Sequence, residues 1–263
     1  MKTASQMPVV LTIAGSDSGG GAGIQADLKT FAALGVHGAS AITCLTAQNP
    51  ARVSGIEAAS PRIVRQQMEA VLTGLPPAAV KTGMLYSAEI IRAVARSFRS
   101  PTRPPLVVDP VMVSTSGARL LQPAAIRELT GKLFPLATLI TPNLDEAAVL
   151  LGRKPATLEA MRTAARELHL RFGCAVLMKG GHLRGQREAA DIFFDGQTEL
   201  LLLAPFIRGL HLHGTGCTYS AAIAGYLARG SELAVAVTQA KEFITRAIAG
   251  SRSIGKHTAL VPS

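Results

Sequence analysis

Short runs of apolar and polar residues alternate along the chain and predict strands and helices in turn. Brief β-branched runs predict buried strands, and apolar residues that recur every three or four positions predict helices. The predicted strands are Pro8–Ala14, Ala39–Thr46, Ala78–Lys81, Leu106–Val108, Thr138–Thr141 and Ala175–Met178, followed by a hairpin of Ala189–Phe194 and Leu200–Ala204. The predicted helices are Ile24–Leu34, Pro61–Leu72, Ala88–Phe98, Pro123–Leu133, Leu144–Leu151, Leu158–Phe172, Tyr219–Ala228 and Leu233–Ile254.

This alternation predicts an α/β protein with a mostly parallel central sheet and helices on both of its faces. No fixed-period repeat or low-complexity segment divides the chain, so we expect residues 1–263 to form a single domain. In such a sheet the carboxyl ends of the strands meet at one edge, where open α/β proteins bind ligands. Polar or reactive side chains that follow strands or begin helices are therefore expected to share one crevice. They are Asp27, Gln48, Asp109, Asn143, Glu146, Lys179 and Cys217.

The run from His213 to Thr218, HGTGCT, precedes a helix of small residues and predicts an anion site. Its two glycines allow a tight turn, and the helix that follows directs its free N–H groups and positive dipole end at the same place. Such a turn suits the charge that develops on a phosphoryl group in transfer. Cys217 lies in the first helical turn, where we expect the thiol pKa to fall. Alternatively, the glycines cap an ordinary helix and Cys217 is a small core residue.

A second glycine-rich stretch, from Gly15 to Gly23, links the first predicted strand to the first helix. It lacks the Lys-Ser/Thr pair of a Walker A loop. It also has Ile24 where the dinucleotide-binding pattern needs its third glycine. The two commonest nucleotide-binding loops are thereby excluded. Asp27 follows in the first helical turn, where an acidic residue can also simply complement the helix dipole.

The other candidates each have a structural explanation beside the functional one. Gln48 is either a ligand at a strand end or a turn residue before a proline. Asp109 either partners a metal–phosphate complex or caps a loop. Asn143 and Glu146 have the spacing of a helix N-cap and capping box. Lys179, followed by two glycines, either reaches a nucleotide phosphate or is a solvated turn lysine.

Composition narrows the classes of function. The chain has 27 Lys and Arg against 17 Asp and Glu, but the basic residues are scattered singly and aromatic residues make up only 4%. A nucleic-acid partner is therefore not indicated, whereas a small anionic substrate fits the charge. We expect no membrane partner, because no apolar run reaches the length of a membrane helix. Cys44, Cys174 and Cys217 are odd in number and widely spaced, so we expect a reducing compartment, the cytoplasm.

Seven motifs follow one another along nearly the whole chain, at residues 14–27, 46–49, 81–85, 108–112, 141–147, 178–182 and 213–218. In order and spacing they resemble the hydroxymethylpyrimidine/phosphomethylpyrimidine kinases, thiamine-pathway members of the ribokinase-like superfamily. The resemblance implies a ribokinase-like kinase domain over residues 1–263 that uses ATP and Mg²⁺ and forms a homodimer. It implies phosphorylation of 4-amino-5-hydroxymethyl-2-methylpyrimidine, and then of its monophosphate to the diphosphate.

The resemblance also implies where the pyrimidine binds. The first glycine loop would hold it, with Asp27 and Gln48 hydrogen-bonding its ring nitrogens and amino group. The residues that would line this pocket are Gly15, Ala22, Met84 and Val111.

For phosphoryl transfer, the resemblance implies that Lys179, Asn143 and Thr215 bind ATP. Asp109 and Glu146, together with Asn143, would organise Mg²⁺. The turn Gly214-Thr215-Gly216 would form the anion hole, and Cys217 would be the catalytic base.

Two other functions are compatible with these residues. A pyridoxal or pyridoxine kinase shares the fold and the phosphate machinery. A non-catalytic pyrimidine-binding protein would keep the pocket, but we would expect it to have lost Lys179, the glycine turn or Cys217, all of which are present.

Overall fold

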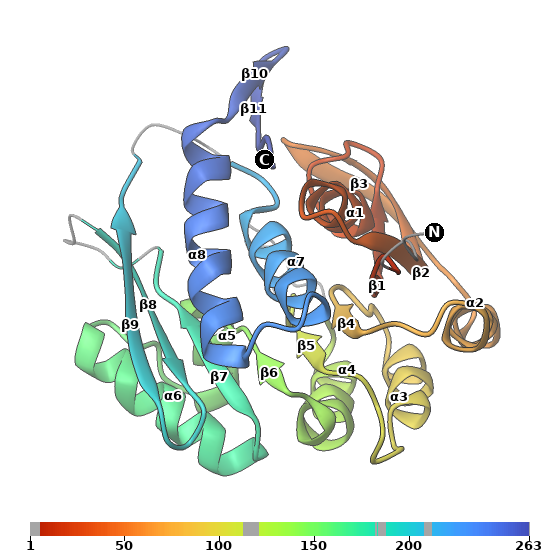
Figure 1. The fold of residues 1–263 in the computed structure, drawn as a ribbon, viewed down its shortest axis with the longest axis horizontal. Coiled ribbons are helices and arrows are strands. Elements are labelled where there is room, and N and C mark those ends of the chain that lie inside the picture. Colours follow the sequence, from red (N-terminus) through yellow and green to blue (C-terminus); the bar gives the residue numbers. More distant parts are fainter. Residues whose placement is uncertain (1–5, 113–120, 182, 184–187, 208–211, 263) are drawn as a thin grey trace, which may run out of the picture.

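The computed structural model describes residues 6–112, 121–181, 183, 188–207 and 212–262, in which strands and helices alternate along the chain (Figure 1). The strands are β1 (Val9–Asp17), β2 (His37–Asn49), β3 (Arg52–Ala58), β4 (Ala79–Thr82), β5 (Leu106–Val108), β6 (Leu139–Ile140), β7 (Ala175–Lys179), β8 (Glu188–Phe194), β9 (Glu199–Pro205), β10 (Arg252–Ile254) and β11 (His257–Ala259). The α-helices are α1 (Gly23–Ala33), α2 (Pro61–Gly74), α3 (Ala88–Ser97), α4 (Pro123–Glu128), α5 (Leu144–Leu151), α6 (Leu158–Phe172), α7 (Thr215–Ala228) and α8 (Leu233–Ala249). Residue 182, the last residue of the motif at 178–182, lies outside the described part.

Nine strands form one sheet in the order β3-β2-β1-β4-β5-β6-β7-β8-β9. The central pairs, from β2 through β7, are parallel. Antiparallel strands extend both edges, with β3 beside β2 and the β8–β9 hairpin beside β7. The expected α/β architecture is therefore confirmed, and the carboxyl ends of the central strands share one edge.

Alternate side chains of the central strands build two separate cores, because successive residues of a strand point to opposite faces. Val107 of β5 packs in the core that α1, α7 and α8 cover. Its neighbours Leu106 and Val108 pack in the core that α2 to α6 cover. Both sets of helices are seen on their two sides of the sheet in Figure 1. A sheet buried on both faces explains why its strands appear in the sequence as continuous apolar runs.

The predicted helix Leu233–Ile254 is too long. The helix α8 ends at Ala249, and Arg252–Ile254 instead forms β10, which pairs with β11 in a separate antiparallel ribbon. Gly250 follows the last helical residue, and Gly255 adopts a φ of 57° in the turn between the two strands. These glycines favour a stop and a reversal, and the apolar pattern alone did not reveal either.

The edge strand β3 was not predicted. Most of its residues are exposed, so it lacks the apolar alternation by which a half-buried strand is recognised. The first strand is also longer than predicted, because β1 passes Gly15 and continues to Asp17 through an irregularity between Ala14 and Ser16. This extension brings the first glycine motif to the edge of the sheet.

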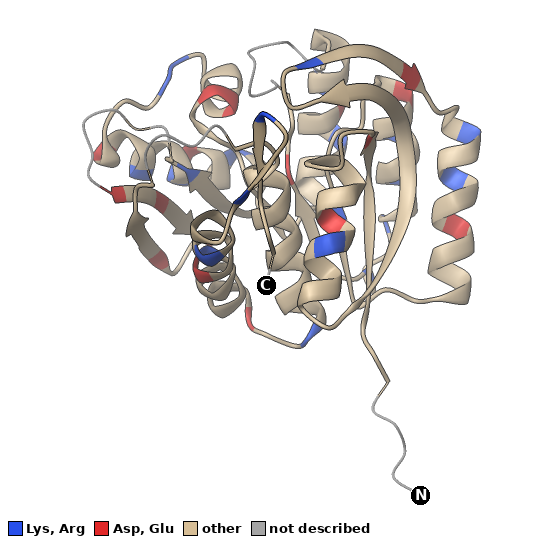
Figure 2. Ribbon diagram, turned by 90° about the horizontal axis from the view of Figure 1, so that it is seen from above, with Lys and Arg blue, Asp and Glu red and all other residues tan. Residues whose placement is uncertain are grey.

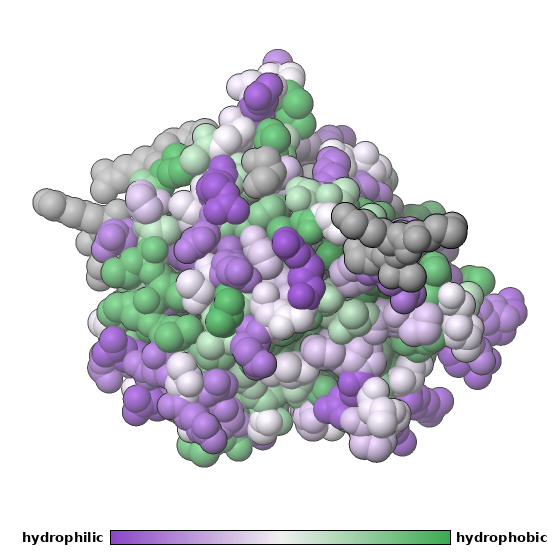
Figure 3. All heavy atoms as spheres, in the orientation of Figure 1, coloured by the Kyte–Doolittle hydropathy of each residue, from purple (hydrophilic) through white to green (hydrophobic). Residues whose placement is uncertain are grey.

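The surface carries basic residues on many elements rather than in one cluster (Figure 2). An apolar area lies over the β8–β9 end of the sheet (Figure 3), where Leu201 and Leu203 of the edge strand are exposed. Among the described helices, none has both the length and the hydropathy to cross a membrane.

Candidate active site

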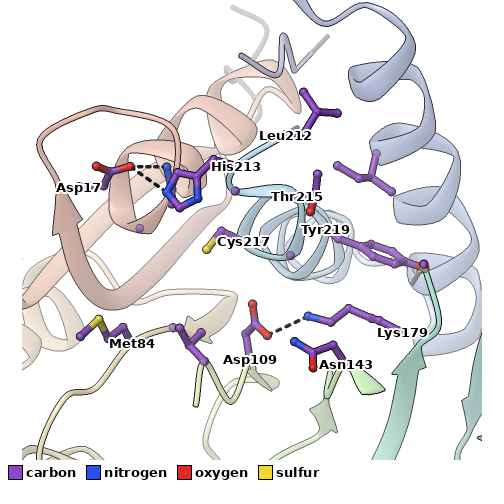
Figure 4. A pocket seen from close by; sticks show the side chains of 18 of the residues that line it. Asp17, Met84, Asp109, Asn143, Lys179, Leu212, His213, Thr215, Cys217 and Tyr219 are labelled. Carbon is purple, nitrogen blue, oxygen red and sulfur yellow. Dashed lines mark hydrogen bonds and ion pairs between the residues drawn. The ribbon is translucent and has the colours of Figure 1, made fainter. Parts of the chain in front are cut away.

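The carboxyl ends of the parallel strands surround a cavity of about 520 Å³. It extends from the loops that follow β1, β2 and β4, past the start of α7, to the space between the β8–β9 hairpin and α8 (Figure 4). Every candidate residue from the sequence lines this cavity except Asp27. The prediction that residues far apart in the chain share one crevice is therefore correct for all but one of them.

The HGTGCT run forms the predicted turn before a helix. Gly214 is the N-cap of α7 and has a φ of 83°, which glycine adopts without strain. A Cβ atom at Gly214 would lie 1.8 Å from the carbonyl oxygen of Gly21, so this turn packs directly on the first glycine loop. The first N–H groups of α7 have no partner within the helix, and this end of the helix faces the cavity. The geometry therefore suits an anion.

A buried ion pair lies below this turn. Lys179 at the end of β7 donates to Asp109 Oδ1 over 3.0 Å. The same carboxylate accepts hydrogen bonds from Thr141 and Ser220. Burial by itself raises the pKa of Asp109, but Lys179, Lys81 and the hydroxyl of Ser220 hold it below its ordinary value. Asp109 is therefore a carboxylate, and Lys179 is a cation that an anionic ligand can draw away from it.

Asn143 and Glu146 form the capping box that their spacing predicts. Asn143 Oδ1 accepts from the N–H of Glu146, and Glu146 Oε2 accepts from the N–H of Asn143, both over 2.9 Å. Glu146 Oε1 also accepts from the N–H of Met112. Burial, together with the nearby charge of Asp109, raises the pKa of Glu146 to about 7. Because both side chains also line the cavity, the capping role does not exclude a role toward a ligand.

Asp27 is buried away from the cavity, and its position does not support the expected contact with a pyrimidine. Both of its carboxylate oxygens lie 2.9 Å from Lys81 Nζ, and one also accepts from the hydroxyl of Thr12. Burial disfavours the ammonium of Lys81, but the charges of Asp27 and Asp109 raise its pKa above the ordinary value. Lys81, not Asp27, lines the cavity, and the sequence had indicated it only as part of a motif.

The expected low pKa of Cys217 is wrong for this cavity. Burial raises the pKa of its thiol to about 11, and the charges of Asp27 and Asp109 act in the same direction. Lys81 lowers it, but by less. The positive end of one helix does not outweigh the loss of solvent and two nearby carboxylates. Cys217 is therefore a thiol at neutral pH.

Two further residues that the sequence did not single out, Asp17 and His213, stand beside Gln48. Gln48 Nε2 lies 2.6 Å from His213 Nε2, and Asp17 Oδ2 lies 3.5 Å from the same nitrogen. Asp17 also accepts from the N–H groups of Gly19, Gly21 and Ala22, and so holds the first glycine loop in shape. Burial raises the pKa of Asp17, but His213 and the N–H groups of Gly19 and Ala22 hold it below its ordinary value.

A third buried ion pair lies at the other end of the cavity. Asp191 of β8 accepts from Lys241 of α8 over 2.7 Å and from the N–H of Gly180 over 2.9 Å. It thus fixes the turn that follows Lys179. Asp191 is a single charge within the apolar segment Ala189–Phe194, and that pattern was the signal in the sequence that could have revealed it, whereas Lys241 is followed directly by Glu242 and gave no such signal.

Val111 lines the cavity with a φ of 44°, a conformation that β-branched residues rarely adopt. Such strain persists only where the surroundings impose it, and it is frequent at ligand sites. Met84 also lines the cavity, on the side away from Lys179 (Figure 4). These two side chains make part of the cavity lining apolar.

Comparisons with known proteins point to one family. The sequence profile of the phosphomethylpyrimidine kinase family matches residues 17–261. A hydroxymethylpyrimidine/phosphomethylpyrimidine kinase of Rhizobium meliloti is 53% identical over 244 residues, which cover 92% of this chain and 91% of the relative. A bifunctional thiamine biosynthesis protein of Geobacter sulfurreducens is 49% identical over 94% of this chain, which spans only 50% of that longer relative.

Solved structures share the fold. An ADP complex of Bacillus subtilis pyridoxal kinase superposes with a TM-score of 0.90 at 38% identity, covering 98% of both chains. A phosphomethylpyrimidine kinase of Clostridium difficile superposes with a TM-score of 0.81 at 44% identity, covering 92% of this chain and 99% of the other. The fold is therefore ribokinase-like.

Proposed function

This chain belongs to the phosphomethylpyrimidine kinase family, and we propose that it phosphorylates 4-amino-5-hydroxymethyl-2-methylpyrimidine with ATP and then converts the monophosphate to the diphosphate for thiamine synthesis. One observation carries this proposal. One cavity holds an amide side chain and apolar side chains at one end, a helix N-terminus in its middle and a lysine beyond it (Figure 4). A ring and a triphosphate can thus meet at the start of α7.

We propose that the hydroxymethyl oxygen attacks the γ-phosphorus while the bond to the β-phosphate oxygen breaks and ADP leaves. The N–H groups at Gly214-Thr215-Gly216 would stabilise the negative charge of the transferred group. Lys179 and Asn143 would hold the phosphates. A Cβ at Gly216 would lie only 3.3 Å from Lys179 Nζ, so the missing side chain keeps open the gap between the lysine and the helix.

We propose that Mg²⁺ is held through water rather than by a preformed cage. Among the described residues, no group of three or more His, Cys, Asp and Glu side chains is placed to hold a metal. Asp109 and Glu146 are two carboxylates near Lys179, and Mg²⁺ needs only one or two beside substrate phosphates. When bound, Mg²⁺ would neutralise charge on the phosphates.

We propose that Cys217 accepts the hydroxyl proton as its thiolate. Its raised pKa makes this form scarce, so positioning and the anion hole would supply most of the catalysis.

We propose also that residues 1–263 act as one kinase domain and assemble as a homodimer in the cytoplasm. The three unpaired cysteines are compatible with that compartment, and light scattering would test the dimer.

A coupled assay that compares hydroxymethylpyrimidine, its monophosphate and pyridoxal tests the proposed function. We expect turnover of both pyrimidines with ATP and a much lower kcat/KM for pyridoxal. Pyridoxal kinase activity is the second candidate, since a pyridoxal kinase superposes with a TM-score of 0.90. A higher kcat/KM for pyridoxal than for either pyrimidine would favour that candidate.

Gln48→Ala should weaken pyrimidine binding by about 1–3 kcal/mol, because the buried amino group loses its partner. Affinity for ATP should hardly change. Calorimetry with each ligand measures both effects, and Gln66→Ala on the exposed face of α2 is the control. Equal losses for both ligands would show that Gln48 supports the fold instead of the pyrimidine.

Glu146→Gln should raise the Mg²⁺ concentration needed for half-maximal rate and leave the helix content unchanged, because a carboxylate is lost beside the phosphates. The neighbouring exposed residue provides a matched control, Asp145→Asn. If Glu146→Gln lowers the melting temperature and the Mg²⁺ titration does not move, Glu146 is a capping residue only.

A further inference from the structure

A chain of polar side chains joins the first glycine loop to the start of α7, and the proposed reaction does not account for it. Gln48 Nε2 lies 2.6 Å from His213 Nε2, and Gln48 Oε1 lies 3.1 Å from Thr46 Oγ1. The Thr46 hydroxyl also lies 3.0 Å from the carbonyl oxygen of Ser16. Asp17 Oδ2 lies 3.5 Å from His213 Nε2. Each of these contacts needs one hydrogen between two heavy atoms.

The side chains do not carry enough hydrogens to make all of these contacts in every possible arrangement of protons. The hydroxyl of Thr46 has one proton but faces two oxygen atoms, so it can donate to only one of them. His213 Nε2 carries either a proton or a lone pair, and it faces both the Gln48 amide and a carboxylate. The amide occupies the same space when its nitrogen and oxygen exchange places. The proton position on His213 therefore decides the orientation of the amide.

One arrangement satisfies three of the four contacts outright, and the fourth, between His213 and Asp17, then shares the proton on Nε2. If Nε2 carries the proton, His213 donates to the Gln48 oxygen and faces the carboxylate of Asp17 with a hydrogen. The Gln48 nitrogen then donates to Thr46, and Thr46 donates to the carbonyl of Ser16. In the opposite arrangement, Ser16 loses its donor and a lone pair on His213 faces Asp17. Unsatisfied polar atoms in a partly buried network are costly, so the first arrangement is favoured.

The backbone holds this chain of contacts in place. Asp17 accepts three loop N–H groups and cannot easily turn away. His213 directly precedes Gly214, which packs on Gly21 of the loop. Figure 4 shows Asp17 and His213 directed toward one another beside Cys217. The carboxylate thus favours a proton on the Nε2 atom of His213, and the histidine in turn favours one orientation of Gln48.

We propose that His213 is a positioning residue that fixes the orientation of the Gln48 amide and thereby selects aminopyrimidines over hydroxypyridines. The inference rests on the proposed function, in which Gln48 faces the ring. An aminopyrimidine presents a hydrogen-bond donor, its amino group, beside an acceptor, its ring nitrogen. It can therefore pair with the Gln48 amide in one orientation only. A phenolic oxygen at that place can both donate and accept, so it pairs with either orientation of the amide.

The tautomer is tested without any activity, by ¹⁵N NMR of the histidine-labelled protein. The signal of His213 is assigned by its disappearance in His213→Lys. We expect a proton on Nε2, and we expect Gln48→Ala to shift this signal while the signal of the exposed His37 stays unchanged. A proton on Nδ1 with a bare Nε2 would overturn the inference.

Selectivity is tested with kcat/KM for hydroxymethylpyrimidine and for pyridoxal. We expect His213→Met to lower the value for the pyrimidine by about tenfold or more and to change that for pyridoxal by less than about threefold. His213→Lys keeps a donor toward Gln48 and should retain most of the preference. His37→Met is the control, because that histidine lies at the start of β2, away from the cavity. Equal losses for both substrates would contradict the proposal.

A double-variant cycle separates positioning from a direct contact. If His213 acts through Gln48, His213→Met should have no further effect on selectivity in a Gln48→Ala background. Additive losses would show that His213 acts independently of Gln48, and would overturn the proposal. A wild-type protein that does not turn over hydroxymethylpyrimidine would refute the proposed function and the selectivity together, while the NMR result would still decide the orientation of the amide.

Discussion

At the start of α7, two opposing effects act on the thiol of Cys217. The helix N-terminus favours a thiolate, and burial among the side chains of the cavity disfavours it. Burial is the largest effect and raises the pKa of Cys217 to about 11, and the nearby carboxylates of Asp27 and Asp109 act in the same direction. Position in a helix can be read from a sequence, but the solvent and the charges around a side chain depend on residues far away along the chain.

We predict that iodoacetamide modifies Cys217 slowly at neutral pH and faster by about tenfold per pH unit from about pH 7 to 9, because the thiolate fraction grows in that proportion below the pKa. Mass spectrometry of the modified peptides measures the rate. Cys174 provides the comparison, since burial raises its pKa to about 12 and its side chain is buried. A rate that levels off near pH 7 would show a pKa close to neutral and contradict the role of burial.

At the scale of secondary-structure elements, the ion pair between Asp27 and Lys81 ties α1 to β4. Both side chains have 0% exposure, and Lys81 Nζ lies 2.9 Å from each carboxylate oxygen of Asp27. Removal of one partner leaves the other charge buried without compensation, which is more costly than the loss of a surface pair. This pair therefore holds α1, the helix that follows the first glycine loop, against the sheet.

Asp27→Asn should lower the free energy of unfolding by about 3–5 kcal/mol, since the Lys81 ammonium stays buried without its carboxylate. Urea denaturation measures the loss. The double variant Asp27→Asn, Lys81→Met should recover much of it, because no unpaired charge remains. If Asp27→Asn kept full stability and weakened only pyrimidine binding, Asp27 would belong to the substrate site after all.

The sequence predicted those parts of the site that follow from the order of strands and helices, and it missed those that depend on contacts between distant residues. Strand ends and helix starts placed Gln48, Asp109 and Lys179 at one edge, because sheet topology follows from alternating elements. Spacing along the chain could not show that Asp27 turns into the core, since the decisive partner, Lys81, is 54 residues away. The exposed strand β3 left no apolar signal, and α8 ends at glycines within a continuing apolar pattern.

At the scale of the whole molecule, the charge is strongly positive while the substrates differ in charge. The chain has a formal net charge of +10, and its basic residues lie on many surfaces (Figure 2). A field of this kind raises the local concentration of anions and is screened by salt, with a Debye length of about 10 Å at about 0.1 M ionic strength. ATP and the pyrimidine monophosphate are anions, whereas the hydroxymethylpyrimidine is neutral near pH 7.

We predict that raising the salt concentration from about 50 mM to about 500 mM increases KM several-fold for ATP and for the pyrimidine monophosphate, but less than about twofold for the neutral pyrimidine. Steady-state kinetics with one substrate varied at a time measures this. The neutral substrate is the internal control, because any effect of salt on the fold would alter its KM as well. If all three KM values rise together, salt acts on the structure; if none rises, the +10 charge does not assist binding. In either outcome, the contacts within the cavity alone would account for the affinity for anions.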